Sequence, residues 1–183
     1  MEVLSIGMIE SQSIPKGIEA GDAMLKAAEV ELISAQPICA GKYIVLVSGE
    51  VAAVKSSVAA GEEVCAETLI DTLVIPSLHP QVIPAINCCS DLEEVEAVGI
   101  METFSICAAV IAADAAVKAA DVQLIEVRLG RGLGGKSFVI MSGDVAAVQA
   151  GVKAAESLGE LEGLMAKTVV IPSPHPDLIQ SIL

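Results

Sequence analysis

Two copies of one pattern fill the sequence, and this duplication limits the possible folds more than any other feature. Residues 5–34 align with 97–126 without a gap, and thirteen of these thirty positions are identical. A repeat of about half the chain predicts two duplicated domains rather than a solenoid of short units. We expect the domains at 1–90 and 97–183, joined by an acidic stretch. Later matches keep the same order, pairing 48–54 with 142–148 and 74–80 with 170–176.

Each copy is expected to fold as β-α-β-β-α-β. A first helix begins at Pro15, where a first-turn proline is tolerated, and a second opens at Glu50 and ends near Gly61. This order is the split βαβ arrangement of ferredoxin-like α+β folds, present twice in tandem. One sheet face lacks helices and needs cover, which predicts an oligomer. In the first copy the expected strands are 4–9, 30–33, 43–47 and 68–75.

Composition excludes several classes of partner. The chain has 10 Lys plus Arg against 24 Asp plus Glu, and its net charge of −14 argues against nucleic acid and anionic membranes. Aromatic residues make up 2%, so no platform for stacking bases is expected. No stretch is apolar for long enough to span a bilayer. Five cysteines without a visible secretion signal predict a reducing compartment and no full disulfide framework.

No group of residues predicts catalysis, so we expect a protein that is not an enzyme. Glu10 and Glu102 are related by the repeat and are expected to serve one structural role twice. Residues 130–135 formally match GxGxxG, but a strand rather than a helix is expected to follow, so a turn explains the glycines better. His79 and His175 occupy equivalent positions and are interpreted as turn or subunit-contact residues, because further metal ligands are not evident.

Segments of both copies resemble a known family, the shell domains of bacterial microcompartments. Two such domains in one chain resemble the tandem-domain branch of that family, which forms trimers. The resemblance implies a flat homotrimer that mimics a hexagon, tiles with other shell proteins and belongs to a microcompartment shell in the cytoplasm. The segments that carry it are 21–28, 41–43, 47–54 and 170–176.

The resemblance also implies contacts at the edges of each tile. Lys26 and Lys118 match the edge lysines that pair neighbouring tiles in the family. Without the resemblance, both would be interpreted as ordinary exposed helix lysines. Ser77 and Ser173 depart from the pattern, because many members carry an arginine there that docks into the next tile.

Residues 37–43 are similar to the pore segment of a branch whose trimer holds an iron–sulfur cluster on its threefold axis. The resemblance implies one pore cysteine per subunit as ligand, here Cys39, and one [4Fe–4S] cluster per trimer. A single chain lacks the cysteine spacing that clusters use, but a threefold axis would bring three thiolates together. The other four cysteines are expected to be structural. The expected pore lining is Ile38, Cys39 and Ala40 from the first copy and Arg131, Gly132, Leu133 and Gly134 from the second.

Arg131 is a candidate for tuning such a cluster. A nearby guanidinium would favour thiolate over thiol and offset an anionic cluster, while solvated or salt-bridged arginine is an equal alternative. The leading hypothesis is a shell tile whose cluster moves electrons across the shell or is delivered to redox enzymes in the lumen. A plain tile with a metabolite-conducting pore, lined by Cys39, is the first alternative. The second is a small-molecule-sensing regulatory module of the same strand order.

Overall fold

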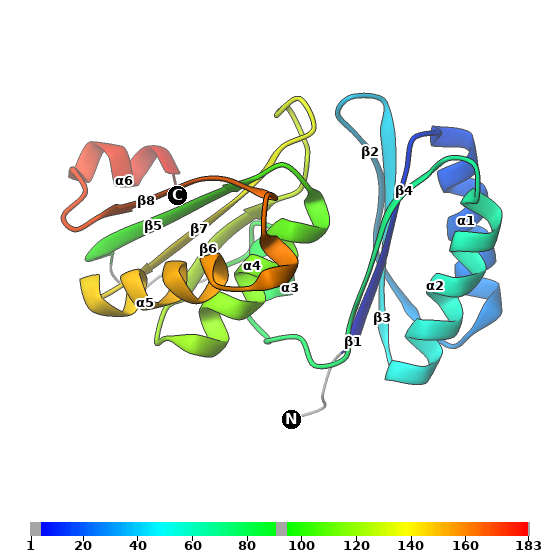
Figure 1. Ribbon diagram of the computed structural model, residues 1–183, viewed down its shortest axis with the longest axis horizontal. Helices are drawn as coiled ribbons and strands as arrows, with labels where there is room; N and C mark the ends of the chain where they lie inside the picture. The colour runs from blue at the N-terminus through cyan, green and yellow to red at the C-terminus, as the bar shows by residue number, and fades with distance from the viewer. Residues whose placement is uncertain (1–4, 91–94, 183) are drawn as a thin grey trace. The chain divides into compact units, whose positions relative to one another are not determined.

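The chain forms two compact units, and the computed structural model describes its residues 5–90 and 95–182 (Figure 1). Unit 1 is Met1–Leu78 and unit 2 is His79–Leu183. Residues 79–90 belong to the first repeat by sequence but pack with the second repeat. Part of the expected linker lies outside the described residues. Within the described ranges, no helix combines the length and the apolar character needed to cross a membrane.

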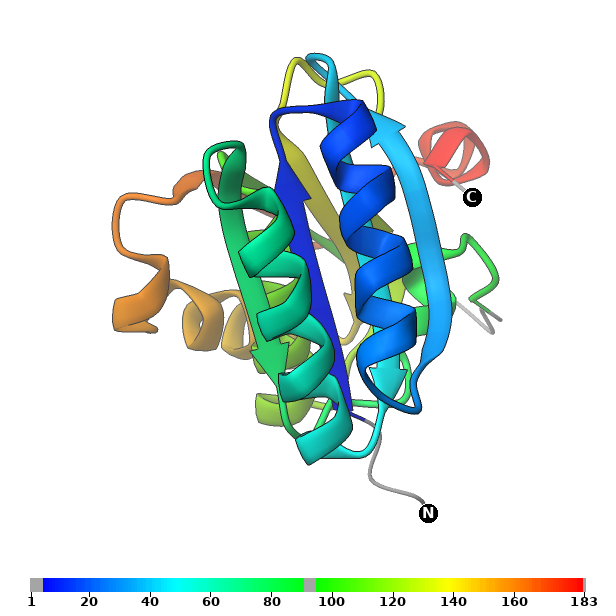
Figure 2. The same cartoon turned by 90° about the vertical axis from the view of Figure 1, so that its right-hand side faces the viewer.

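Unit 1 has the predicted β-α-β-β-α-β order. Its sheet runs β2-β3-β1-β4, and every neighbouring pair is antiparallel. Both helices lie on one face of this sheet (Figure 2). The ferredoxin-like arrangement is therefore confirmed for this unit. Its elements are β1 (Ser5–Ser11), α1 (Ile14–Ala27), β2 (Glu31–Ile38), β3 (Lys42–Gly49), α2 (Val51–Cys65) and β4 (Leu69–Ile75).

Unit 2 repeats this order and adds a short helix before it and another after it. Its sheet runs β6-β7-β5-β8, again antiparallel throughout, so the tandem α+β fold is confirmed. The shared elements are β5 (Ala97–Thr103), α4 (Ile106–Ala119), β6 (Gln123–Arg128), β7 (Ser137–Gly143), α5 (Val145–Glu156) and β8 (Met165–Ile171). The added helices are α3 (Val82–Ile86) and α6 (Pro176–Ile182), and a 3-10 turn (Gly159–Leu161) lies between α5 and β8.

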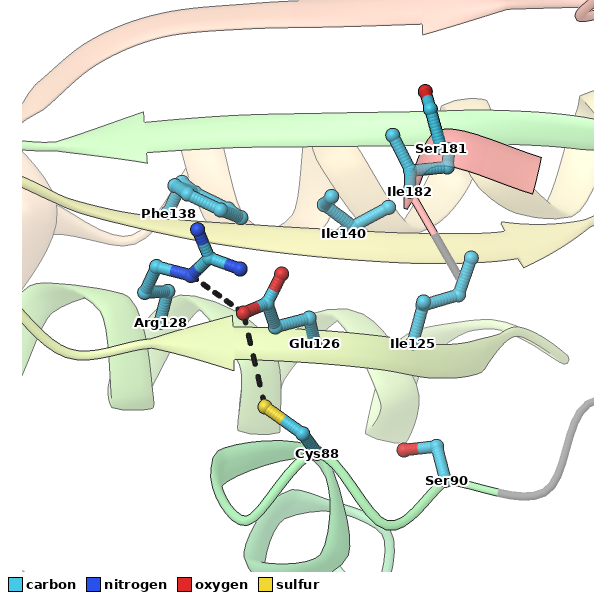
Figure 3. A pocket seen from close by; sticks show the side chains of 9 residues that line it. All are labelled: Cys88, Ser90, Ile125, Glu126, Arg128, Phe138, Ile140, Ser181 and Ile182. Carbon is cyan, nitrogen blue, oxygen red and sulfur yellow. Dashed lines mark hydrogen bonds and ion pairs between the residues drawn. The ribbon is translucent and has the colours of Figure 1, made fainter. Parts of the chain in front are cut away.

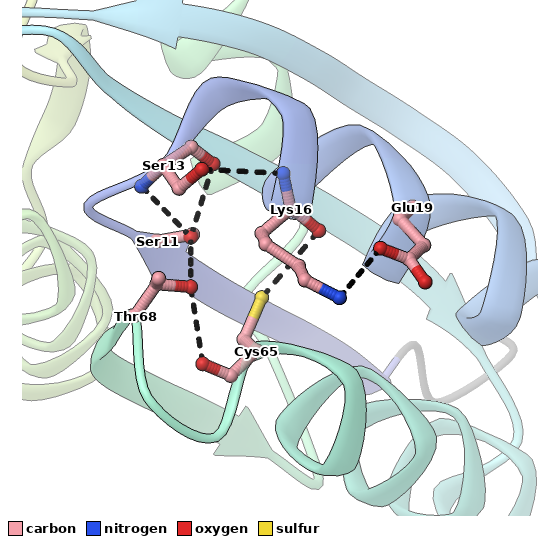
Figure 4. Close-up of polar contacts among 6 residues, drawn as sticks. All are labelled: Ser11, Ser13, Lys16, Glu19, Cys65 and Thr68. Atoms are coloured by element: carbon pink, nitrogen blue, oxygen red, sulfur yellow. Dashed lines mark hydrogen bonds and ion pairs between the residues drawn. The ribbon is translucent and has the colours of Figure 1, made fainter.

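A small polar network ties the start of α1 to the end of α2 (Figure 4). The hydroxyl of Ser13 accepts a hydrogen bond from the Lys16 backbone N–H at 3.4 Å, which satisfies one of the donors left open at a helix start. The hydroxyls of Ser11 and Thr68 lie 3.0 Å apart, and Thr68 donates to the Cys65 carbonyl. The Cys65 thiol contacts the Lys16 carbonyl at 3.7 Å. Cys65 is therefore structural, as expected.

Close contact between α1 and α2 corrects one boundary. Gly61 was predicted near the end of α2, but the helix continues to Cys65 and Gly61 is buried inside it. A Cβ atom at Gly61 would lie 2.8 Å from the sulfur of Met24 on α1. The glycine therefore allows two helices to approach each other and does not end one. Ile9, Met24 and Val45 belong to the core cluster formed between this helix pair and the sheet.

Candidate functional site

Cys39 lies in the tight turn that joins β2 to β3. Gly41 closes the turn by donating its N–H to the Ile38 carbonyl at 3.1 Å, and its φ of +77° is a conformation that favours glycine. Ile38 is buried, Cys39 is half-buried and Ala40 is exposed. An added Cβ at Gly41 would meet no atom within 4 Å, so the space beside the turn is open. The thiol therefore sits next to a turn that a ligand or a second chain can approach closely.

A buried ion pair anchors this turn to the centre of the sheet. Lys42, the first residue of β3, places Nζ 2.7 Å from Oε1 of Glu10 on β1. The Glu10 side chain is only 2% exposed, whereas that of Lys42 is 27% exposed. The repeat-related pair, Glu102 and Lys136, is longer at 3.2 Å, with side chains 40% and 44% exposed. The prediction that Glu10 and Glu102 share a structural role is confirmed.

The described residues of one chain are not grouped into a metal centre. Among the residues that the structure describes, no three His, Cys, Asp or Glu side chains are grouped to hold a metal ion. All five cysteines are thiols, and Cys107 is buried in α4 as expected. The soft donor and the open turn at Cys39 fit an iron–sulfur cluster only if copies of this turn converge.

The matching connection in unit 2 is longer and rich in glycine. It covers residues 129–136 between β6 and β7, and Gly130, Gly132 and Gly134 all have positive φ. The Gly130 N–H donates to the Ser137 hydroxyl at 3.2 Å, which fixes the end of the loop. Strand β7 follows directly, so the GxGxxG segment is a loop rather than a nucleotide-binding fingerprint, as predicted. Of the expected pore residues here, Arg131, Gly132 and Gly134 are exposed and Leu133 is half-buried.

The two edge lysines occupy equivalent positions one helical turn after an aspartate. Lys26 pairs with Asp22 on α1, and Lys118 pairs with Asp114 on α4. The first pair is exposed, whereas Asp114 is mostly buried. Both aspartates position the lysine along its own helix. Whether the lysines contact neighbouring tiles stays a prediction.

Unit 2 contains an open hollow of about 600 Å³ that the sequence did not reveal (Figure 3). Arg128 places Nε 2.6 Å from Oε1 of Glu126, and its guanidinium lies 5.0 Å from the centre of the Phe138 ring. The Cys88 thiol contacts the same carboxylate oxygen at 3.8 Å. Burial, and then the Glu126 charge, raise the pKa of Cys88 above that of an ordinary thiol. No motif could have found this group, because its residues come from separate elements.

The chain consists of two ferredoxin-like units in tandem, and the turns that join β2 to β3 and β6 to β7 differ between them. The BMC domain family matches residues 5–78 and 97–174, most of both repeats. The chain belongs to the shell proteins of bacterial microcompartments, and the predicted resemblance is confirmed.

Individual relatives show which shell proteins this chain is most like in length and domain content, namely those with two domains in tandem. The chain is 44% identical over 175 residues to the bacterial microcompartment shell protein PduT of Citrobacter freundii, covering 95% of each chain. It is 40% identical over 87 residues to the carboxysome shell protein CsoS1A of Hydrogenovibrio crunogenus, covering 91% of that protein but only 46% of this chain. A crystal structure of a microcompartment protein from Desulfitobacterium hafniense superposes with a TM-score of 0.92 at 50% identity, covering 97% of this chain and 99% of that one. The chain is thus a shell protein of the PduT type.

Proposed function

We propose that this shell protein forms a homotrimeric tile whose central pore holds one [4Fe–4S] cluster between three copies of Cys39. The observation that carries the proposal is the position of Cys39, a soft donor, beside an open turn, while the described residues hold no metal-binding group of three His, Cys, Asp or Glu side chains. A cluster takes up to four thiolates, and a threefold axis multiplies one thiol by three. One iron would then be left for a small external ligand.

The residues around the turn suit this role. The Glu10–Lys42 pair holds the base of β3, so Cys39 is carried on a fixed strand end rather than a loose loop. The small residues Ala40 and Gly41 leave room for neighbouring copies beside the axis. When bound, the cluster would supply one-electron transfer, which suits passage of electrons across the shell or delivery of the cluster to lumen redox enzymes. Arg131, proposed to face the same pore, would add positive charge near an anionic cluster.

The experiment is anaerobic purification of the full chain followed by iron and sulfide analysis and visible absorption. Wild type is expected to hold about four iron atoms per three chains and to absorb broadly in the visible range. Cys39→Ser should lose both signals and keep its oligomeric state. Cys88→Ser is the matched control, because it removes another accessible thiol and should leave the iron content unchanged. A colourless wild type after reconstitution, or unchanged iron in Cys39→Ser, would refute the cluster.

A plain tile with a metabolite-conducting pore is the second candidate. The glycine-rich loop of unit 2 favours it, since added Cβ atoms at Gly132 or Gly134 would meet nothing within 4 Å. Small exposed residues at a pore leave room for a solute to pass. Intact sheets under the electron microscope without iron in any preparation would support this function instead. The family match favours either tile over a regulatory module.

A further inference from the structure

A polar hollow lies at one end of the sheet in unit 2, and its volume is about 420 Å³. Gln123, at the start of β6, pairs with Ser142, near the end of β7, so the segments beyond this pair come together there. Two aspartates, Asp121 and Asp144, line the hollow. Among the described residues of its wall, none is a lysine, an arginine or a histidine, so the wall carries two negative charges and no positive one.

Gly143 brings these two aspartates close to each other. A Cβ atom at Gly143 would lie 3.1 Å from the Asp121 carbonyl oxygen, so the two segments pass at a distance that leaves little room for a side chain. Asp144 follows Gly143 directly, and both aspartates are exposed at the hollow. Like charges held near each other repel, and a cation bound between them would replace this repulsion by attraction.

The carboxylate of Asp144 is held in place by its own helix. Its Oδ1 accepts from the Ala147 N–H at 2.8 Å as the cap of α5, while Oδ2 has no partner among the described residues. The carboxylate of Asp121 likewise has no hydrogen-bond or ion-pair partner in the part of the chain that the structure describes. Both side chains therefore offer oxygen atoms to a ligand, and one of the two is already oriented.

Ser142 gives independent evidence that a ligand binds here. Its side chain is 1% exposed, and its hydroxyl has no hydrogen-bond partner among the described residues. An unpaired buried hydroxyl is costly, and native proteins usually satisfy such a group with an ordered water or an ion. Ser142 also lines the hollow. The unpaired hydroxyl and the two carboxylates therefore belong to one site.

We propose that this hollow binds a hard divalent cation, Mg²⁺ or Ca²⁺, through the carboxylates of Asp121 and Asp144 and the hydroxyl of Ser142. All three donors are oxygen atoms, which these cations prefer, and no thiol or imidazole lines the hollow among the described residues. With only two carboxylates in the site, water supplies the remaining ligands on the open side. Such a site predicts weak binding, with a Kd on the order of 10⁻⁴ to 10⁻³ M.

The cation site is separate from the turn that carries Cys39. Cys39 follows the end of β2, and its counterpart loop joins the end of β6 to the start of β7. The hollow instead lies at the start of β6 and the end of β7, which is the opposite end of the same strand pair. A cation there joins β6, β7 and the start of α5, so it stabilises unit 2 by binding its folded state. The inference does not depend on a cluster.

The test is binding of Mn²⁺ to the full chain, measured by the electron paramagnetic resonance signal of free Mn²⁺. Mn²⁺ takes the same oxygen ligands, and competition by Mg²⁺ and by Ca²⁺ shows which of the two binds more tightly. Asp121→Asn and Asp144→Asn should each weaken binding about tenfold or more, because each removes one of two charged ligands. Asparagine caps a helix as well as aspartate does, so Asp144→Asn keeps the start of α5.

Two control variants make the result specific to the hollow. Asp177→Asn is the matched control, because it removes the same charge from a side chain that is 86% exposed in the same unit but outside the hollow, and it should bind Mn²⁺ like wild type. Cys39→Ser should also bind like wild type, which separates this site from the proposed cluster. Paramagnetic broadening of amide signals should begin at Val122 and Gly143 and leave Gly41 sharp.

Ser142→Ala tests the buried hydroxyl directly. It should weaken Mn²⁺ binding roughly two- to tenfold, the usual range for one lost polar contact. Without divalent cations, the same variant should unfold at a urea concentration equal to or higher than wild type, because it removes an unpaired buried group.

Four results would overturn the proposal. The first is unchanged Mn²⁺ affinity in Asp121→Asn. The second is broadening spread over the acidic surface without preference for Val122 and Gly143, which would mean adventitious binding only. The third is loss of Mn²⁺ binding in Cys39→Ser, which would place the metal at the turn. The fourth is destabilisation of metal-free chain by Ser142→Ala, since the hydroxyl would then have a partner within the protein.

Discussion

Replacing Lys42 by methionine tests whether the ion pair under the Cys39 turn stabilises unit 1. Lys42→Met keeps most of the side-chain volume but removes the charge 2.7 Å from Oε1 of Glu10. The carboxylate, only 2% exposed, would then lose its ion-pair partner in a site that water barely reaches. Removing one member of a buried pair costs about 3 to 5 kcal/mol, because the remaining charge is uncompensated.

The repeat supplies a matched control at the equivalent position. Lys136→Met removes the same kind of partner from Glu102, but these side chains are 44% and 40% exposed and 3.2 Å apart. Solvent screens such a pair, and its loss costs about 0 to 1 kcal/mol. The two variants should therefore differ by about 2 kcal/mol or more in the free energy of unfolding, although the substitution and the topology are the same.

The measurement is urea unfolding followed by circular dichroism, at one protein concentration and one ionic strength for all variants. Urea is preferred because guanidinium chloride would screen the charges being compared. Glu10→Gln combined with Lys42→Met should recover part of the loss, since the buried carboxylate is gone. Equal destabilisation by Lys42→Met and Lys136→Met would show that burial of Glu10 does not set the strength of the pair.

Two further predictions concern a helix cap and a thiol. Asp144→Ala should cost about 0.5 to 2 kcal/mol in urea unfolding, because Oδ1 of Asp144 accepts from the Ala147 N–H at 2.8 Å, while Glu50→Ala should cost less, because Glu50 makes no such cap. Cys88 should react slowly with iodoacetamide near pH 8, and Glu126→Gln should speed this reaction by lowering the pKa of the thiol. Peptide mass spectrometry gives the rate, and an unchanged rate in Glu126→Gln would contradict the assigned cause.

The fold was predictable from the sequence because the duplicated pattern fixed the order of elements twice over. The strand order and the shared role of Glu10 and Glu102 followed from that repeat. The residue at which α2 ends was not predicted correctly. The sequence pattern cannot distinguish a glycine that ends a helix from a glycine that lets a second helix pack closely against it. At Gly61 the neighbour is Met24, which lies 37 residues away in sequence.

The site was only partly predictable for a related reason. The sequence predicted Cys39 between two strands, and the structure has it in the turn from β2 to β3, while its role as a ligand stays a prediction. The hollow around Glu126 was missed, because Cys88 reaches it from a loop after α3 whose packing no local pattern encodes. The sequence also did not predict that Leu32 is exposed while Leu124 is buried. The two residues occupy equivalent positions in β2 and β6, and they differ only in what packs over them.

Comparison of the repeats suggests why duplication suits a cluster-bearing tile. The strand order and the Glu–Lys ion pair are kept in both copies, whereas the connection after β2 and the one after β6 have diverged into a tight cysteine turn and a glycine-rich loop. A ring of six identical domains would place six copies of any turn residue around its axis, more thiolates than a [4Fe–4S] cluster accepts. In the proposed trimer, two unlike domains per chain reduce that number to three and leave three positions for Arg131 and its glycines. Divergence between the two copies would therefore give the proposed pore three cysteine ligands instead of six identical residues.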